Sequence, residues 1–324
     1  MILILDILRY VSNRIRNEIE IEIGQDYMKL EEIRLRINCP IILKFNKNEK
    51  VLNTIIFQQD IKECIQYICE NSIYAYQNEI NQGFITIRGG HRVGITGECV
   101  IESNKVINIS YIYSLNYRIS KQIIGAANEI LKYIINKNNN EVLSTLIISP
   151  PGAGKTTILR DLVRQLSQGI ENLKFNGKNI GVVDERSEIA AMYKGIPQND
   201  LGIRTDILNN IPKAIGIEML IRSMSPDIII ADEIGNLDDV KAINYAMTCG
   251  IKGIFTAHGG SLNDINSKEY LNQLIKQNLV DSLIFLDKSN KGKIKEIYYL
   301  KNKKDLVLKG TSFEYYKEEV NKVC

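Results

Sequence analysis

The first third of the chain carries strand-like alternation of apolar and polar residues. In "EEIRLRINCP" (residues 31–40), apolar residues alternate with charged ones, which is the period of a half-buried strand. The apolar members of that run are Ile33, Leu35 and Ile37. The following "IILKF" (41–45) predicts a second strand.

A helical period follows in "DIKECIQYICENSIYAY" (60–76), where Asp60 is placed to cap the first turn. One face of this helix is apolar and consists of Ile61, Cys64, Ile65 and Ile68. The run "GFITIRGGHRVGITGECVIESNKVINI" (83–109) predicts short strands separated by glycine turns. Strands and helix together predict a small α+β domain.

The pattern changes near "SLNYRIS" (114–120), so we place a domain boundary there and expect domains at 1–118 and 119–324. "QIIGAANEILKYII" (122–135) predicts a helix, and short apolar strands then alternate with helical stretches. These strands are "STLIIS" (144–149), "NIGVVD" (179–184), "DIIIAD" (227–232) and "GIFTA" (253–257). Such alternation predicts an α/β fold with a parallel sheet covered on both faces. "DSLIFLDKSNKGKIKEIYYL" (281–300) predicts an antiparallel hairpin with its turn at "SNKGK".

Composition narrows the class of protein. The chain has 324 residues, 24% of them charged, and a formal net charge of only +3, which gives no strong field for coating nucleic acid or anionic lipid. The apolar start "MILILDIL" is short, contains Asp6 and runs into charged residues, so it is not expected to span a bilayer. We therefore expect a cytosolic protein without a membrane span, and nucleic acid is not the expected partner.

The cysteines contain no C-x-x-C pair, so no structural zinc clasp is expected. They lie in apolar stretches, where we expect reduced and mostly buried side chains. They are Cys39, Cys64, Cys69, Cys99, Cys249 and Cys324.

"LIISPPGAGKTTILRDL" (146–162) has the order of a phosphate-binding loop, namely buried strand, glycine turn and amphipathic helix. Ser149 occupies the place of the first glycine of the pattern, but the glycines nearest Lys155 are present. We expect Lys155 to meet the β- and γ-phosphates of ATP and Thr156 to offer its hydroxyl to Mg²⁺. The expected nucleotide-binding residues are Ser149, Pro150, Pro151, Gly152, Ala153, Gly154, Lys155, Thr156 and Thr157. The helix face expected to pack on the sheet is Ile158, Leu159, Leu162, Val163 and Leu166.

A second motif, "SMSPDIIIADEIGN" (223–236), is a buried strand that ends in two acids. Asp232 is placed to hold Mg²⁺, and Glu233 to orient or deprotonate the attacking water. The alternative is a pair of solvated acids at a strand end. In combination with the phosphate loop, the adjacent carboxylate favours hydrolysis over transfer to a small acceptor.

Two further strand ends carry candidate residues. "GVVDERSEIA" (181–190) places Asp184 and Glu185 where they could position water or metal, with solvated loop charge as the alternative for Glu185. "GIFTAHGG" (253–260) places His258 at a strand end before two glycines, which suits sensing of the γ-phosphate, whereas a lone histidine is more often structural.

These strings occur together in one known family. In order they are "EEIRLRINCP", "GGHRVGITGE", "SLNYRIS", "ISPPGAGKTTILRD", "VVDERSEIA", "GIRTDIL", "PKAIGIEMLIRSMSPDIIIADEIG" and "FTAHG". In order and spacing they resemble the stage III sporulation protein AA family across nearly the whole chain, including the serine at position 149. That family is similar to the type II and type IV secretion and pilus ATPases.

This resemblance implies a RecA-like core of the AAA+ type, a smaller N-terminal domain and a homo-oligomeric ring, usually a hexamer. It also implies that "VVDERSE" takes the place of their Asp box, "DIIIADEIG" of their Walker B and "FTAHG" of their His box. The chain departs from the secretion motors by having Asp232 where they commonly have glycine, which leaves the division of labour between Asp232 and Glu233 open.

The resemblance further implies an arginine-bearing strand in the N-terminal domain that reaches the nucleotide when the domains close. Arg92 is the first candidate, and Arg88 and Arg118 are lesser ones. A surface salt bridge is the alternative.

The role implied by the family is that of a cytosolic ATPase in the mother cell. It would energise assembly of, or transport through, a channel of membrane-embedded proteins facing the forespore. Two alternatives stay open from the residues. One is an ATPase stimulated by nucleic acid, although the tail "KNKKDLVLKGTSFEYYKEEVNKVC" (301–324) has no histidine of the R-x-x-x-H kind. The other is a nucleotide switch that turns over little.

Overall fold

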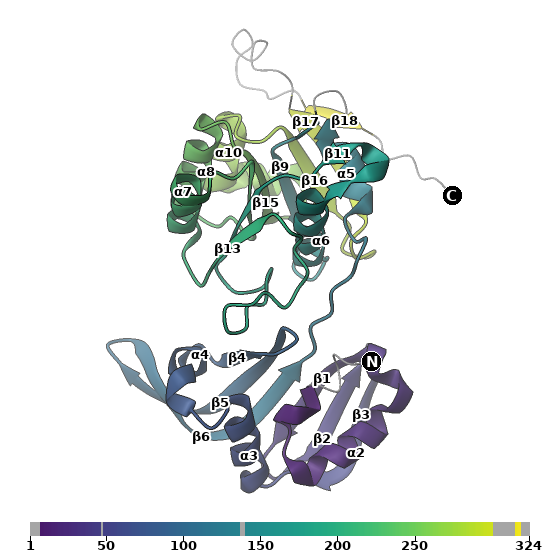
Figure 1. Ribbon diagram of the computed structural model, residues 1–324, viewed down its shortest axis with the longest axis vertical. Coiled ribbons are helices and arrows are strands. Elements are labelled where there is room, and N and C mark those ends of the chain that lie inside the picture. Colours follow the sequence, from purple (N-terminus) through teal and green to yellow (C-terminus); the bar gives the residue numbers. More distant parts are fainter. Residues whose placement is uncertain (1–6, 47, 137–139, 301–314, 319–324) are drawn as a thin grey trace. The chain divides into compact units, whose positions relative to one another are not determined.

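The computed structural model of the protein describes residues 7–46, 48–136, 140–300 and 315–318, and shows two compact units (Figure 1). The N-terminal unit consists of residues 1–121 and 191–198, and the second of residues 122–190 and 199–324. Division into separately folding domains at 118/119 stays a prediction. Over the described residues, no helix combines the length and hydrophobicity that a membrane span requires.

Within the described residues the N-terminal unit contains a six-stranded sheet of order β3-β2-β1-β6-β5-β4, and the pairs along it are antiparallel. Its strands are β1 (Leu30–Arg36), β2 (Pro40–Phe45), β3 (Asn48–Ile55), β4 (Phe84–Ile87), β5 (His91–Glu102) and β6 (Lys105–Arg118). The two strands predicted at 31–40 and 41–45 are confirmed as β1 and β2. Their alternation buries Ile33 and Leu35 on one face and leaves charged residues on the other.

Helices cover the apolar face of this sheet. The helical elements are η1 (Ile7–Tyr10), α2 (Asn13–Ile23), η2 (Gly24–Lys29), α3 (Gln58–Ile68), η3 (Ile73–Tyr76) and α4 (Gln77–Asn81). Ile15 and Ile19 of α2, and Ile61 and Ile65 of α3, belong to the same buried cluster as the inward side chains of the strands. The predicted helix at 60–76 is therefore confirmed in its apolar face but ends at Ile68.

Asp60 is not the cap residue, because α3 begins two residues earlier than predicted. Its carboxylate instead accepts hydrogen bonds from the backbone N–H of Phe57 at 2.8 Å and from the hydroxyl of Ser12 at 2.9 Å. Arg14 completes the arrangement with an ion pair of 2.5 Å. An acid in the first turn thus joins α2 to α3.

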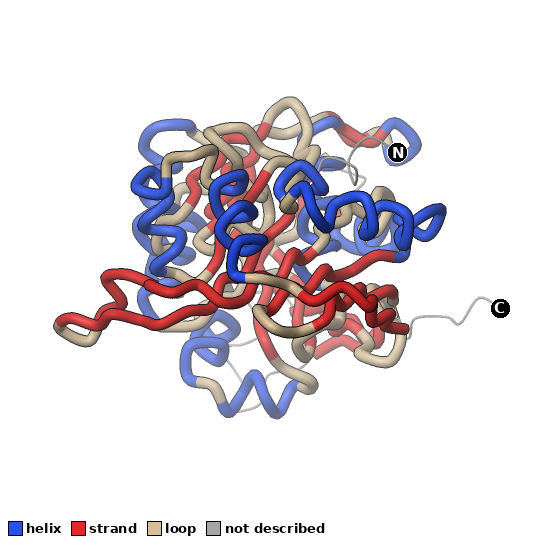
Figure 2. Tube along the Cα trace, turned by 90° about the horizontal axis from the view of Figure 1, so that it is seen from below, coloured by secondary structure: helices blue, strands red, loops and turns tan. Residues whose placement is uncertain are grey.

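Of the short strands predicted at 83–109, β4 is confirmed and is followed by a glycine turn at Gly89 and Gly90, but the rest are wrong in length. β5 and β6 are long, with Gly94 and Gly97 inside β5 and the turn between the strands at Ser103 and Asn104. Figure 2 shows this hairpin extending beyond the other strands of the sheet. Glycine here marks an irregularity at Gly97, where the register shifts, and not a turn.

The segment 191–198 belongs to the N-terminal unit although it follows the "VVDERSEIA" string of the second. Tyr193 and Lys194 each bind a carboxylate oxygen of Glu70 at 2.5 Å. Gln198 accepts a hydrogen bond of 2.8 Å from the N–H of Gly89. No sequence pattern indicated this attachment.

The described part of the second unit is built on an eight-stranded sheet of order β13-β12-β14-β15-β9-β16-β17-β18. The strands from β13 to β16 pair in parallel, and β17 and β18 are antiparallel additions. Its strands are β9 (Thr145–Ser149), β12 (Ile180–Asp184), β13 (Thr205–Asn209), β14 (Ile228–Ala231), β15 (Lys252–His258), β16 (Ser282–Leu286), β17 (Ile294–Leu300) and β18 (Tyr315–Glu318). Two small pairs are β7 (Ile135–Asn136) with β8 (Glu141–Val142), and β10 (Gly169–Ile170) with β11 (Phe175–Asn176).

The four predicted parallel strands and the predicted hairpin are confirmed, whereas β13 was not foreseen. The helices of this unit are α5 (Asn128–Ile134), α6 (Lys155–Gln168), η4 (Glu171–Leu173), α7 (Lys213–Met224), α8 (Leu237–Thr248), α9 (Leu262–Ser267) and α10 (Glu269–Lys276). The helix predicted over 122–135 is reduced to α5. All five apolar residues predicted for the inner face of α6 are buried.

The expectation of mostly buried cysteines is wrong. Cys64 and Cys69 are buried, Cys39 is half-buried, and Cys99 and Cys249 are exposed; all five are free thiols. Burial raises the pKa of the Cys64 and Cys69 thiols to about 11. Cys324 and the expected start at residues 1–6 lie outside the described residues, as does most of the tail 301–324.

Candidate functional site

The phosphate loop connects β9 to α6 with the geometry that its glycines predict. Gly152 has a φ of 79° and Gly154 a φ of 99°, both in the left-handed region that side chains disfavour. Gly154 lies immediately before the first turn of α6. The loop therefore delivers the chain to a helix N-terminus whose backbone N–H groups face the end of the parallel strand.

Lys155 is buried, with 6% of its surface exposed. Its ammonium donates to the carbonyls of Ser149 at 3.0 Å and Pro150 at 3.4 Å. Burial lowers the pKa of this ammonium, and the negative charges of Asp232 and Glu233 oppose the shift. The lysine is thus held beneath the loop, close to the two acids that follow β14.

Ser149 contributes mainly through its backbone. The Ser149 hydroxyl donates to the carbonyl of Pro150 at 2.9 Å, and its distance to Lys155 Nζ is a longer 3.3 Å. The stronger bond to Lys155 uses the carbonyl, which any residue at this position has. Serine in place of the first glycine is therefore compatible with the loop.

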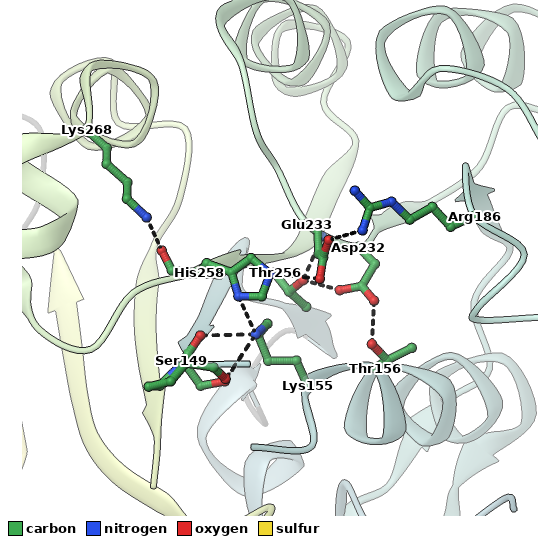
Figure 3. Close-up of polar contacts among 10 residues, drawn as sticks. Ser149, Lys155, Thr156, Arg186, Asp232, Glu233, Thr256, His258 and Lys268 are labelled. Atoms are coloured by element: carbon green, nitrogen blue, oxygen red, sulfur yellow. Dashed lines mark hydrogen bonds and ion pairs between the residues drawn. The ribbon is translucent and has the colours of Figure 1, made fainter. Parts of the chain in front are cut away.

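Thr156 and Asp232 form the donor set that a P-loop Mg²⁺ site needs. The Thr156 hydroxyl donates to Asp232 Oδ2 at 2.6 Å, and Thr256 donates to Oδ1 of the same carboxylate (Figure 3). A hydroxyl beside a carboxylate supplies hard oxygen ligands and leaves the remaining positions to phosphate and water. No group of three or more histidines, cysteines or acids suited to a metal occurs in the described part of the chain. A metal ion bound by Thr156 and Asp232 would therefore also need phosphate and water as ligands.

Glu233 is fixed from both sides. Its backbone has a φ of 54°, in the left-handed region, and its N–H donates to Thr256 Oγ1 at 2.8 Å. The side-chain Oε1 lies 2.9 Å from His258 Nε2, and Oε2 lies 2.8 Å from Arg186 Nη1. The turn after β14 therefore aims the carboxylate at the strand ends β15 and β12 (Figure 3).

His258 connects the lysine to the glutamate. Its Nδ1 is 3.2 Å from Lys155 Nζ, and an ammonium only donates, so Nδ1 accepts and Nε2 carries the hydrogen directed at Glu233. His258 is the register partner of Ser149 in the pairing of β15 with β9. The sheet itself therefore brings together residues that lie more than a hundred positions apart.

Asp184 and Glu185 lie near this centre but have other partners. Asp184 is 2% exposed, and its oxygens accept from the backbone N–H groups of Glu188, Ile189 and Ala190 at 2.8, 3.1 and 2.8 Å. Glu185 forms an ion pair with the nearly buried Lys213. These contacts favour an organising role for Asp184 in the loop after β12, so its direct action on water or metal remains a hypothesis.

The three candidate arginines of the N-terminal unit lie on two neighbouring strands of its sheet and in the turn that precedes one of them. Arg92 on β5 and Arg118 on β6 are register partners, and Arg88 is in the turn before β5. The guanidinium of Arg92 stacks over the ring of Phe84 at 4.8 Å. Their contact with nucleotide stays a prediction.

Sequence reasoning missed several contributors to the site. The Thr256 hydroxyl donates to the carboxylate of Asp232 and accepts from the backbone N–H of Glu233. Arg186 binds the carboxylate of Glu233, and Lys268 Nζ donates to the carbonyl of His258 at 2.7 Å. The N–H of Gly292, in the hairpin turn, donates to the carbonyl of Ala153 in the phosphate loop at 2.9 Å. Thr256, Arg186 and Gly292 lie within the quoted strings, which was the available signal, whereas Lys268 lies outside them.

Comparison with known proteins agrees with the strings that led to this site. A sequence model of the family described as "Sporulation stage III, protein AA" matches residues 4–305. The stage III sporulation protein AA of Bacillus subtilis is 39% identical over 275 residues, which are 85% of this chain and 88% of that protein.

Solved structures of an ATPase and of a pilus motor share the fold. The ATPase DotB of Legionella pneumophila aligns with a TM-score of 0.54 at 14% identity, over 91% of this chain and 83% of DotB. The pilus retraction motor PilT, solved with bound ADP, aligns with a TM-score of 0.55 at 13% identity, over 85% of this chain and 78% of PilT. The expected α/β fold with a RecA-like P-loop core is therefore confirmed.

Proposed function

Because the chain belongs to the sporulation stage III protein AA family, we propose that it is a Mg²⁺-dependent ATP hydrolase that works as a motor. One observation supports the chemistry. Glu233 follows Asp232, the candidate ligand of Mg²⁺, at the end of β14 and close to the phosphate loop. Its carboxylate is held by His258, which also contacts Lys155 of that loop. This arrangement suits hydrolysis, because a carboxylate is positioned beside the place where a γ-phosphate would end.

Each residue has a defined part in the proposed reaction. Lys155 and the N–H groups of the glycine loop bind the phosphates, and Glu233 orients the attacking water and takes up its proton. Thr156 and Asp232 would hold Mg²⁺, which when bound neutralises the charge between the β- and γ-phosphates. His258 keeps Glu233 directed toward the phosphate loop.

The proposed cellular role is more specific. The protein forms a ring, as a hexamer, on the cytosolic face of the mother-cell membrane that faces the forespore. It energises assembly of, or transport through, a channel of sporulation proteins. The family name and the fold shared with DotB and the pilus motor PilT support this proposal.

Phosphate release by the purified full chain, with ATP and Mg²⁺, tests the activity. We expect hydrolysis that is lost in Lys155→Ala and retained in Lys241→Ala, an exposed lysine on α8 paired with Asp238. Specific activity should rise with protein concentration if sites are completed between subunits. A flat rate near zero at all concentrations would instead support the nucleotide switch.

The same assay addresses the second function class. Single-stranded DNA or RNA is added at low salt, where phosphate contacts are strongest. The motor proposal expects an unchanged rate, whereas a strong rise would favour the ATPase stimulated by nucleic acid.

A further inference from the structure

The outer face of the N-terminal sheet is strongly basic. The inward side chains of β1, β5 and β6 form the apolar core, so the alternate residues project to the opposite face. Cross-strand pairs on that face place Arg34 opposite Asn116, Arg36 opposite Ser114, and Arg118 opposite both Glu32 and Arg92. Arginines from three neighbouring strands thus share one surface of a single unit.

This face is hollowed into a cavity of about 560 Å³. It lies over β1, β5 and β6, and its lining includes Arg34, Arg36, Gly94, Thr96, Asn116 and Arg118. Gly94 leaves space at its floor, because a Cβ added there would have no neighbour closer than 3.8 Å. The volume falls in the range of sites for small molecules and is too compact for a folded partner.

The positive charge of the cavity is only partly balanced. Arg34 Nε pairs with Glu32 at 2.6 Å, but none of the described lining residues is acidic. The guanidinium groups of Arg36, which is half-buried, and Arg118 form no hydrogen bond or ion pair with the described part of the chain. Asn116 Oδ1 is buried and also has no partner there. Polar groups left unpaired in this way favour an outside ligand.

The pKa of Glu32 reflects the positive charge of this face. Burial opposes its ionisation, but the hydrogen bond from Arg34 and the charges of Arg34, Lys44 and Arg118 outweigh it and lower the pKa of this carboxyl. One acid therefore faces a surplus of cations.

We propose that this cavity, which no residue of the phosphate loop lines, is a second ligand site and binds a small molecule carrying a multiply charged phosphate group. Guanidinium groups match phosphate oxygens in pairs, and an anion with at least two charges is needed to balance Arg36 and Arg118. The phosphate could belong to a soluble compound or to a lipid headgroup.

Equilibrium dialysis of the full chain against radiolabelled pyrophosphate tests the proposal. The background is Lys155→Ala, which removes phosphate binding at the loop while leaving the cavity unchanged. We expect one bound equivalent per chain, with affinity falling as salt rises. Arg36→Ala should weaken it by about 10-fold or more. Gly94→Leu, whose Cβ would have no neighbour closer than 3.8 Å, adds an apolar side chain at the floor of the cavity and should abolish binding. Arg222→Ala, which changes an exposed arginine of α7, should not alter binding.

A second arm distinguishes the source of the phosphate. Flotation with phosphatidylglycerol vesicles, compared with phosphatidylcholine vesicles, should depend on Arg36 and Gly94 only if a lipid headgroup is the ligand. The proposal is overturned if neither pyrophosphate nor the vesicles bind the Lys155→Ala chain. It is also overturned if adding Arg36→Ala and adding Gly94→Leu both leave the affinity of that chain unchanged. Thermal unfolding of each variant checks that the fold is retained. ATP hydrolysis by the wild type is measured separately, so failure here is distinct from failure of the proposed activity.

Discussion

His258 Nε2 lies 2.9 Å from Glu233 Oε1, and the second oxygen of the same carboxylate is paired with Arg186. Glu233 therefore has both oxygens engaged by donors. To accept a proton from water, the carboxylate must give up its bond to one of these two donors. Arg186 is the more exposed donor, with 67% of its side chain accessible against 39% for His258. Exposed ion pairs are weak, so we expect the pair with Arg186 to open first.

Glu233→Gln should separate binding from hydrolysis. The amide keeps the size of the side chain but cannot take a proton, so we expect the hydrolysis rate to fall by about 100-fold or more while ATP binding is retained. Phosphate release and equilibrium dialysis with ATP measure the two quantities. A variant that hydrolyses ATP at the wild-type rate would contradict the proposed role as base.

His258→Ala should lower kcat with little change in KM, because the histidine positions Glu233 and its loss leaves one of the two donors. We expect a fall of about 10-fold, partly restored in His258→Gln, whose amide can donate to the carboxylate. Steady-state kinetics of the two variants supply the comparison. An effect confined to KM would assign His258 to nucleotide binding instead.

Ser149→Gly restores the usual first glycine of the loop and should change little. The 3.0 Å bond to Lys155 uses the backbone carbonyl, and only the long 3.3 Å contact of the hydroxyl is lost. We expect the Kd for ATP to stay within about 3-fold of wild type. A larger change, measured by titration calorimetry, would show that the hydroxyl itself contributes to binding.

Asp184→Ala tests whether this acid organises a loop or acts on substrate. Removing the carboxylate leaves three backbone N–H groups without their acceptor, at a cost of about 2 kcal/mol. Hydrogen exchange at residues 188–190 should therefore accelerate together with any loss of hydrolysis. Lost hydrolysis with unchanged exchange would instead assign Asp184 a direct part in the reaction.

Asp60→Asn should destabilise the N-terminal unit by about 2 kcal/mol near neutral pH, because the buried carboxylate that binds the part-exposed Arg14 is replaced by a neutral amide with one acceptor oxygen. Burial raises the pKa of Asp60, but hydrogen bonds from Arg14, Phe57 and Ser12 outweigh it and lower the pKa overall. A lowered pKa in the folded state adds stability above the unfolded pKa, which is lost as pH falls through the folded value.

The difference between wild type and Asp60→Asn should accordingly shrink below about pH 4. Urea denaturation at several pH values, with hydrogen exchange of α2 and α3 to localise the effect, provides the measurement. A difference that is independent of pH would mean that the charge of Asp60 does not stabilise the fold.

Much of the second unit is predictable from local sequence. The phosphate loop needs only a strand, glycines with positive φ and a helix start, all of which are contiguous between Thr145 and Gln168. The parallel strands were equally evident, since apolar runs buried on both faces leave a clear signal. The N-terminal sheet was predicted less well, because glycines inside β5 resemble glycines in turns.

The sequence by itself determined which residue types stand at the start of α6 and at the strand ends, including Lys155, Asp232, Glu233 and His258. Only the tertiary structure decided their partners. Strand order places β15 beside β9, so that His258 meets Lys155, and it brings Arg186 to Glu233 from β12. Spacing along a chain sets the position of a side chain on its own strand or helix, whereas partners on other strands depend on long-range pairing that no local pattern encodes.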